Sequence, residues 1–258
     1  MEKADKKLTY VSYLKLDELL ALQQPRSDGP EHDEMLFIVV HQVYELWFKQ
    51  VLHETRALRA ALSAGDSSAA LAGLRRVLTI LKTLVAQIDV LETMTPMSFN
   101  SFRARLDAAS GFQSLQFREL EFLLGYKRAD AAQGRPSLEK ALVEPAVWDA
   151  YLRYLVHQGH AVPAALLARD VREAIQASPD VQDAILSAYR ANGFAAQVSE
   201  RLVDFDEGLQ EWRYRHVKMV ERTIGAKPGT GGSAGAAYLR ETLFKPLFPD
   251  LWEIRARL

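Results

Sequence analysis

Apolar residues recur along most of the chain with the period of about 3.6 residues that is typical of amphipathic helices. From Glu31 to about Leu62 this stripe contains Leu36, Phe37, Val40, Tyr44, Trp47, Phe48, Val51 and Leu52. After Gly65 and Asp66, a second helix capped by Ser67 or Ser68 and running to about residue 93 carries Leu71, Leu74, Leu78, Leu81, Val85, Ile88 and Leu91. A third stripe, over about 196–224, contains Val198, Leu202, Phe205, Leu209, Trp212, His216 and Val220. The pattern predicts three long helices that each bury one face.

Shorter helices are predicted between the remaining glycine and proline residues, which tend to end helices. Pro96 ends the second helix, and a short helix with Phe99, Phe102, Arg103 and Leu106 follows it. Another begins near Gln113, and residues 125–145 are the most loop-like part of the chain. Helices are also predicted at 146–158, 164–177 and 180–192, and a last one near Ala236. Alternating β-branched runs joined by turns do not occur, so the expected fold is an all-α multi-helix bundle.

Composition narrows the class of protein. The 258 residues carry 32 Lys and Arg against 33 Asp and Glu, and this balance argues against nucleic acid or a membrane surface as the partner. Cysteine is absent, which excludes thiolate metal sites and a cysteine nucleophile. Neither a secretory signal nor an apolar run of about 20 residues is visible. We therefore expect one cytoplasmic domain over residues 1–258.

The histidine with the clearest potential for chemistry is His216, because it interrupts an apolar stripe between Trp212 and Val220. A buried imidazole must satisfy two ring nitrogens. It is either a core histidine bonded to a carbonyl or a ligand of a metal or haem iron, and the pattern leaves both open. His41 lies on the first stripe near Phe37, Tyr44 and Phe48, where a core residue, a hydrogen-bonding group or a general base are alternatives.

Two further features suggest a binding site. Arg103 lies among apolar side chains, where a guanidinium either pairs with a buried carboxylate or extends to the surface. Residues 225–235 contain five glycines with the hydroxyls Thr230 and Ser233, which indicates a loop that approaches or covers a ligand. Arg215, Lys218 and Arg222 share a helix face near His216 and are either a solvated face or partners for anionic groups such as haem propionates.

These residues occur together in a pattern that resembles the bacterial tryptophan 2,3-dioxygenase family. The motifs appear in the family's order and span residues 8–239: LTYVSYL at 8–14, FIVVHQ at 37–42, ELWFK at 45–49, FR at 102–103, ASGFQS at 109–114, WR at 212–213 followed by His216, and GTGGS at 229–233 followed by YL at 238–239. Each motif alone is weak, but their combination is specific.

The resemblance implies a homotetrameric, all-α haem domain. Haem b, ferrous in the active state, would have His216 as its axial ligand, with Ser110 and Gly111 close to it. The partners would be L-tryptophan and O₂, and both oxygen atoms would enter the indole C2–C3 bond to give N-formyl-L-kynurenine, the first step of the kynurenine route of tryptophan degradation. The N-terminal segment 1–30 would reach a neighbouring subunit's site through Tyr10, Tyr13 and Leu14.

The resemblance also implies roles at the substrate. His41 would hydrogen-bond the indole N–H as the catalytic histidine, and whether it also removes the proton stays open. Arg103 would pair with the carboxylate, and Thr230 would contact the ammonium and carboxylate groups. The indole pocket would be lined by Phe37, Ile38, Val39 and Val40. Phe99 stands where the family often has tyrosine, and Ala234 where a second serine is expected. The alternatives are a haem-binding or haem-sensing helical protein without turnover and a helical scaffold.

Overall fold

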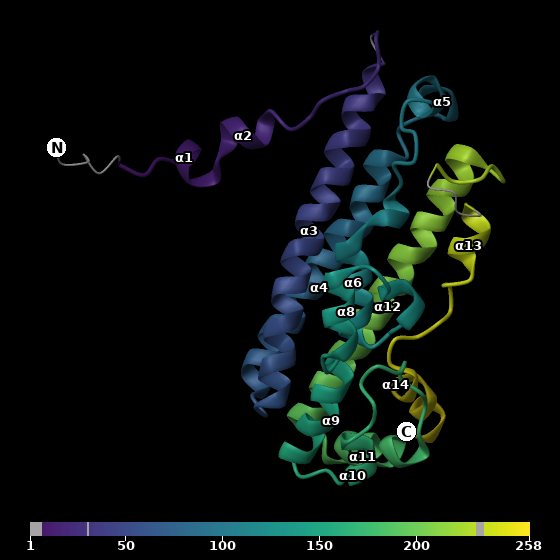
Figure 1. Ribbon diagram of the computed structural model, residues 1–258. Coiled ribbons are helices and arrows are strands. Elements are labelled where there is room, and N and C mark those ends of the chain that lie inside the picture. The colour runs from purple at the N-terminus through teal and green to yellow at the C-terminus, as the bar shows by residue number, and fades with distance from the viewer. Residues whose placement is uncertain (1–6, 30, 231–234) are drawn as a thin grey trace.

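Three long helices form the body of the molecule. The computed structural model describes residues 7–29, 31–230 and 235–258. Helices α3 (His32–Ser63), α4 (Ser67–Leu91) and α12 (Phe194–Ile224) run side by side, and α4 packs against both of the others (Figure 1). All regular elements of the described residues are α or 3₁₀ helices, so the predicted all-α class is confirmed.

Local side chains set the helix starts. Asp66 caps α4 by accepting a hydrogen bond from the Ala69 amide at 2.9 Å, so the predicted cap at Ser67 or Ser68 was one or two residues late. Thr95 caps α5 (Pro96–Arg103), in which Pro96 occupies the first turn, where proline is tolerated. Ser114 caps α6 (Leu115–Leu124), which follows a 3₁₀ turn at Gly111–Gln113.

Residues 125–145 contain more helix than the positions of their glycine and proline residues predicted. They contain α7 (Ala129–Ala132) and α8 (Pro136–Val143), so the loop prediction was wrong for most of this segment. Pro136 begins α8 instead of ending a helix. Leu138 and Ala132 pack with Phe122 of α6 in a small second core. This tertiary packing stabilises helices whose own periodic signal is short.

The end of the bundle far from α5 is closed by short helices. They are α9 (Val147–His157), α10 (Ala164–Leu167), α11 (Pro179–Ala191), α14 (Pro249–Glu253) and the 3₁₀ turn Ile254–Arg257; α13 (Ala236–Arg240) lies beside α12 (Figure 1). The helix predicted over 164–177 stops at Leu167. Arg169 explains the shortening, because its guanidinium bonds Asp149 at 2.6 Å and the Glu173 carbonyl at 2.9 Å, which folds the chain into a turn.

A buried carboxylate attaches the C-terminal segment to α12. Asp206 is fully buried, and its Oδ2 accepts hydrogen bonds from the Leu247 and Phe248 amides at 2.8 and 3.0 Å and from Trp252 Nε1 at 3.0 Å. Its Oδ1 accepts from Gln210 at 2.9 Å. Four donors therefore satisfy one buried charge, which is the condition for such a group to stabilise a fold.

Asp206→Asn is expected to lower the free energy of unfolding by about 2–4 kcal/mol, because the amide presents an N–H group to donors and removes the charge that strengthens these bonds. Urea denaturation measures the change. Glu207→Gln is the matched control: this exposed neighbour on the same helix should change stability by less than about 0.5 kcal/mol. Equal effects of both substitutions would contradict the anchoring role.

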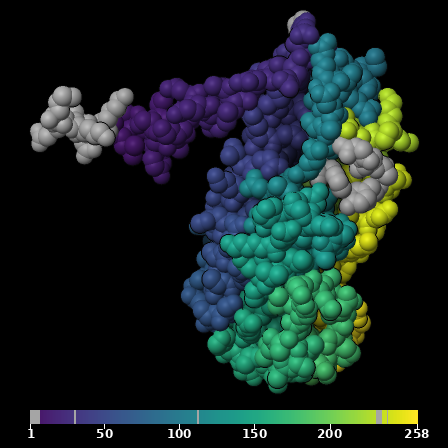
Figure 2. Space-filling model, in the orientation of Figure 1, coloured from purple at the N-terminus to yellow at the C-terminus, as the bar shows by residue number. Residues whose placement is uncertain are grey.

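The N-terminal arm projects away from this body (Figures 1 and 2). It contains α1 (Tyr10–Leu14) and α2 (Leu16–Leu20), which bury no side chain in the chain itself. Gln42 of α3 holds the base of the arm through hydrogen bonds with Gln23 and the Leu22 carbonyl. Among the described residues, no helix has an apolar stretch long enough to cross a bilayer.

Candidate active site

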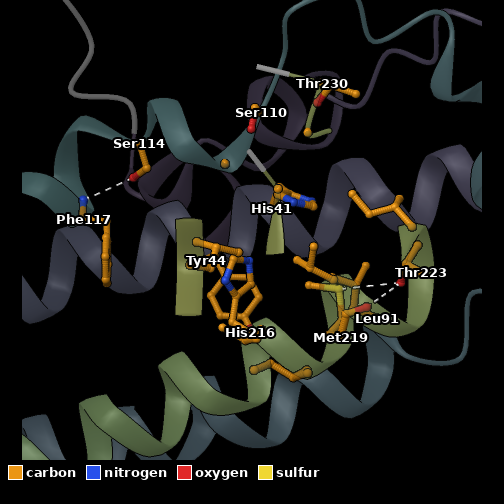
Figure 3. Close-up of a pocket in the computed structure, with 18 of the residues that line it drawn as sticks. His41, Tyr44, Leu91, Ser110, Ser114, Phe117, His216, Met219, Thr223 and Thr230 are labelled. Carbon is orange, nitrogen blue, oxygen red and sulfur yellow. Dashed lines mark hydrogen bonds between the residues drawn. The ribbon is translucent and has the colours of Figure 1, made fainter. Parts of the chain in front are cut away.

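A pocket opens between α3, α5, α6 and α12, where the three long helices leave space near α5. It encloses about 240 Å³ and is mostly apolar. The aromatic side chains that line it are Phe37, Tyr44, Phe48, Phe99, Phe117 and Trp212. Both candidate histidines face it from different helices, His41 from α3 and His216 from α12 (Figure 3). The pocket thus combines an aromatic wall with a few polar groups, as small-molecule sites do.

His216 is a half-buried imidazole whose ring nitrogens form no hydrogen bond to another residue that the structure describes. It stacks on Trp212, one helical turn earlier, with parallel rings 5.2 Å apart. Burial, together with the nearby His41, lowers the pKa of His216 to about 4. The ring is therefore neutral at physiological pH. A neutral, unpartnered imidazole that faces a cavity has the lone pair that a metal ligand requires.

His41 presents an acceptor to the same pocket. Its Nδ1 lies 2.7 Å from the Phe37 carbonyl, one turn earlier on α3. A carbonyl only accepts, so this contact assigns the proton to Nδ1 and leaves the Nε2 lone pair available. Burial lowers the pKa of His41, an effect partly opposed by the Phe37 carbonyl and by Glu45. A neutral imidazole in this tautomer can accept a hydrogen bond from a ligand N–H group.

The glycine stretch meets the short helix α5 at the pocket mouth. Arg103, at the end of α5, donates to the Pro228 carbonyl at 2.6 Å. Thr230 donates to the Ala109 carbonyl at 2.6 Å. Ser110 and Gly111 line the same side of the pocket, and Figure 3 places Ser110 beside Thr230. Ser233 and Ala234 lie outside the described residues. One edge of the pocket therefore carries a guanidinium and hydroxyls, while the wall is aromatic.

The segment after Phe37 does not line the pocket as expected. Of the residues at 37–41, only Phe37 and His41 do so, while Ile38, Val39 and Val40 are absent from the described lining. Successive helical residues are rotated by about 100°, so four consecutive side chains cannot share one face. Val40 is instead buried in the bundle, and Val39 is exposed on the outside of α3. The prediction of a pocket-lining role for these three residues was wrong for this chain's own pocket.

The N-terminal residues also lie away from this pocket. Tyr10 and Tyr13 of the arm are 73% and 70% exposed, and Leu14 is also exposed. These side chains cannot contribute to the site of their own chain in this arrangement. They stay candidates for contact with another copy.

The basic residues near His216 divide into two groups. Arg215 and Arg222 bond Asp89 or Glu92 at the end of α4, and Lys218 pairs with Glu221. These three form the solvated face that the sequence offered as one alternative. Arg213 is different, because it is buried and points to Glu121 of α6 at 2.9 Å.

Sequence reasoning did not identify the pocket's arginine cluster. Arg118, Glu121 and Arg213 all line the pocket. The signal that could have found Arg213 is its position three residues before His216, which places both on neighbouring parts of one helix face. No sequence signal links it to α6, which is about ninety positions earlier.

The fold and the pocket define an all-helical protein with a mostly apolar, aromatic pocket that two imidazoles face. Comparison with known proteins gives the family. The family model described as tryptophan 2,3-dioxygenase matches residues 1–136 and 188–258. The chain is 61% identical over 257 residues to the tryptophan 2,3-dioxygenase of Herpetosiphon aurantiacus, covering 97% of this chain and 98% of that protein.

Two other relatives carry the same name. The tryptophan 2,3-dioxygenase of Anaeromyxobacter dehalogenans is 60% identical over 97% of this chain and 96% of its own length, and that of Caulobacter vibrioides is 43% identical over 97% and 98%. The chain therefore belongs to the tryptophan 2,3-dioxygenase family. It is an oxidoreductase, and its reaction is the oxidation of tryptophan.

Proposed function

We propose that this pocket binds haem b through His216 and L-tryptophan beside His41, and that both atoms of O₂ enter the indole C2–C3 bond to give N-formyl-L-kynurenine. The observation that carries the proposal is the arrangement of a neutral, unpartnered imidazole and a second imidazole with a free acceptor around one aromatic pocket. Every described residue that lines this pocket lies within the ranges that the family model matches.

The residues of the pocket fit a haem. His216 offers an uncommitted nitrogen, and the walls provide the apolar and aromatic surface that a flat porphyrin needs. Trp212 Nε1 is buried without a hydrogen-bond partner in the described structure, so an acceptor from a bound group would satisfy it. When bound, haem supplies the activation of O₂. Ser110 and Gly111 would lie beside it.

The remaining residues bind and orient tryptophan. Arg103 would hold the carboxylate, since its guanidinium has further N–H donors besides the one given to Pro228. Thr230 would contact the ammonium and carboxylate groups. Phe37 and Phe99 form the aromatic wall for the indole, with ring centroids 5.8 Å apart. Phe99 has no hydroxyl to add a hydrogen bond, so the polar recognition falls on Arg103 and Thr230.

His41 would accept the indole N–H through Nε2. This contact fixes which edge of the indole faces the reacting centre, and the apolar wall of the pocket surrounds the ring. The Phe37 carbonyl holds the tautomer that makes the contact possible. His41 thereby acts on the substrate directly.

The active assembly is proposed to be a homotetramer of single-domain chains. Helix α1, which carries the exposed side chains of Tyr10, Tyr13 and Leu14, projects from the chain's own body (Figure 1), and this exposure supports the proposed contact with a neighbouring copy. The cytoplasmic location stays a prediction from the sequence.

A single turnover experiment tests the reaction. Haem-loaded, reduced protein is mixed with L-tryptophan under ¹⁸O₂, and the product is weighed by mass spectrometry. A product heavier than tryptophan by two labelled oxygen atoms is expected. An intact haem spectrum without this product would favour a haem sensor and overturn the proposal.

The pH dependence tests His41. Because the pKa of His41 is lowered from 6.5, its acceptor form persists at neutral pH and is lost only as the pH falls through the lowered value. We expect kcat/KM for tryptophan to fall on the acid side with an apparent pKa below 6.5. His41→Ala should keep haem, lower kcat/KM roughly tenfold through loss of one buried hydrogen bond, and remove this acid limb.

His53→Ala is the matched control, because His53 is an exposed histidine on the same helix. It should leave both the rate and the acid limb unchanged. An acid limb that persists in the His41→Ala variant would assign the titration to another group and contradict the role of His41.

A further inference from the structure

Glu34 attaches the connection between the N-terminal arm and α3 to the first turn of α3. Its side chain is 1% exposed, and both carboxylate oxygens are used: Oε1 accepts from the Arg26 amide at 2.7 Å and Oε2 from the Ser27 amide at 3.0 Å. Burial would raise the pKa of Glu34, but these donors outweigh it and lower the pKa below its usual value. The carboxylate is therefore ionised at neutral pH, and its two bonds to the backbone are charge-assisted.

Gln42 makes a second attachment about two turns further along α3. Its Oε1 accepts from Gln23 Nε2 at 2.6 Å, and its own Nε2 donates to the Leu22 carbonyl at 3.2 Å. The chain therefore runs antiparallel to α3 over residues 22–27, from Gln42 back to Glu34. At a rise of about 1.5 Å per residue, the two attachments lie about 12 Å apart along the helix. Two separated attachments define the direction of this segment, which a single one would not.

The same part of α3 carries the pocket. Phe37 and His41 lie between the two attachment residues in sequence and line the pocket, whereas Glu34 and Gln42 do not belong to its described lining. Since successive helical residues are rotated by about 100°, α3 presents the pocket on one face and the attachments on another. The point where the arm leaves the body is thereby fixed relative to the pocket. In a symmetric assembly, every arm would then approach its neighbour in the same way.

Beyond these attachments the arm depends little on its own chain. Helices α1 and α2 bury no side chain, and they project from the body (Figure 2). The ion pair between Arg105 and Asp28 is 3.8 Å long and Asp28 is fully exposed, so it adds little. The direction of the arm therefore depends mainly on Glu34 and Gln42.

We propose that Glu34 and Gln42 are positioning residues for the pocket of a neighbouring copy, because they set the direction in which the arm carries residues 10–14. The inference rests on the proposed function, in which side chains of α1 contact another copy. An arm that is already directed loses less conformational freedom when it reaches its site. Both residues therefore act in trans: each supports the reaction of a neighbouring chain and not that of its own.

Single variants test the effect on the reaction. Glu34→Gln should lower kcat/KM for tryptophan about fivefold to tenfold with an unchanged Soret band, because the amide presents an N–H group to a backbone donor and carries no charge. Gln42→Ala should lower it roughly twofold to fivefold through loss of the second attachment. Asp33→Asn is the matched control, because it removes the same charge from the same turn of α3. It should leave kcat/KM unchanged.

Mixed assemblies test whether the effect occurs in trans. Glu34→Gln chains are co-expressed with His216→Ala chains, which have an intact arm and a pocket expected to lack haem, and assemblies that contain both are isolated through two affinity tags. Activity per haem then counts only the pockets of the Glu34→Gln chains. In an equal mixture about half of these pockets receive an intact arm, so about half of the lost activity should return. Arg103→Ala in place of Glu34→Gln should show no recovery, because Arg103 belongs to the pocket of its own chain.

Absence of recovery for Glu34→Gln would show that Glu34 acts within its own chain and would overturn the proposal. Unchanged kcat/KM in both Glu34→Gln and Gln42→Ala, or an equal loss in Asp33→Asn, would overturn it as well. If Glu34→Gln chains do not fold, Gln42→Ala chains take their place in the mixture. Tyr13→Ala chains mixed with His216→Ala chains separate this inference from the proposed function. Recovery with Tyr13→Ala alone would reject the positioning role, whereas recovery in neither mixture would show that the arm does not act on a neighbouring copy.

Discussion

Replacement of His216 by alanine is expected to abolish stable haem binding while the helical fold is retained. His216 is the imidazole on the apolar face of α12 that faces the pocket without a partner in the described structure. Changes to groups that merely support a metal ligand commonly cost roughly 10- to 100-fold in affinity, so loss of the ligand itself should cost at least about 100-fold. Soret titration of the apoprotein measures the loss, and far-ultraviolet circular dichroism confirms the fold.

Two further measurements separate ligation from packing. His216→Gly, which leaves a space the size of the ring, should recover a Soret band when imidazole is added. His160→Ala is the matched control, because His160 bonds Ser187 on the surface and does not line the pocket. Full haem affinity in His216→Ala would assign the iron to another residue and refute this role.

The long helices could be predicted closely from the sequence. The first stripe indicated a helix from about 31 to 62, and α3 covers His32–Ser63. Long periodic stripes define such helices because packing of one apolar face supplies most of their stability. The segment 125–145 was misjudged for the opposite reason: α7 and α8 are too short to show a period, and their stability comes from packing on Phe122.

The types of side chain in the candidate site could be predicted from the sequence, but the contacts between different helices could not. An imidazole on an apolar stripe and an arginine among aromatic residues are visible along the chain, and the structure brings His216, His41 and Arg103 to one pocket. The buried ion pair between Arg213 and Glu121 joins two helices that are far apart in sequence. Hydrophobic period determines which face of a helix is buried, but it contains no information on which residue of another helix lies opposite.

The described residues that line the pocket come from both parts of the chain that the family model matches. Residues 137–187, which the family model does not match, contain most of α8, all of α9 and α10 and the first part of α11, and none of them lines the pocket. They pack against α3, α6 and α12 toward the end far from α5 (Figure 1). This segment therefore has room to vary in sequence as long as it continues to support the helices that position His41 and His216.

Arg103→Ala is expected to raise the KM for L-tryptophan about 100-fold and to leave the Soret band unchanged. A guanidinium that holds a carboxylate by charge-assisted, bidentate bonds contributes about 3 kcal/mol, which corresponds to this factor. Steady-state kinetics at fixed O₂ measure it. Arg105→Ala is the matched control, since Arg105 is exposed, does not line the pocket and pairs with Asp28 at the longer distance of 3.8 Å.

The variant also loses the hydrogen bond to Pro228, so a second substrate is needed to isolate the carboxylate contact. Tryptamine has the indole and the amine but no carboxylate. The wild type should therefore prefer tryptophan over tryptamine by about 100-fold in kcat/KM, and Arg103→Ala should reduce that preference to nearly one. If the variant instead slows the reaction of both compounds equally, its preference for tryptophan over tryptamine will be that of the wild type. Arg103 would then only position the glycine stretch and would not bind the substrate carboxylate. Because the ratio cancels any effect on loop position that both substrates share, it decides whether this guanidinium recognises the amino-acid end of the substrate.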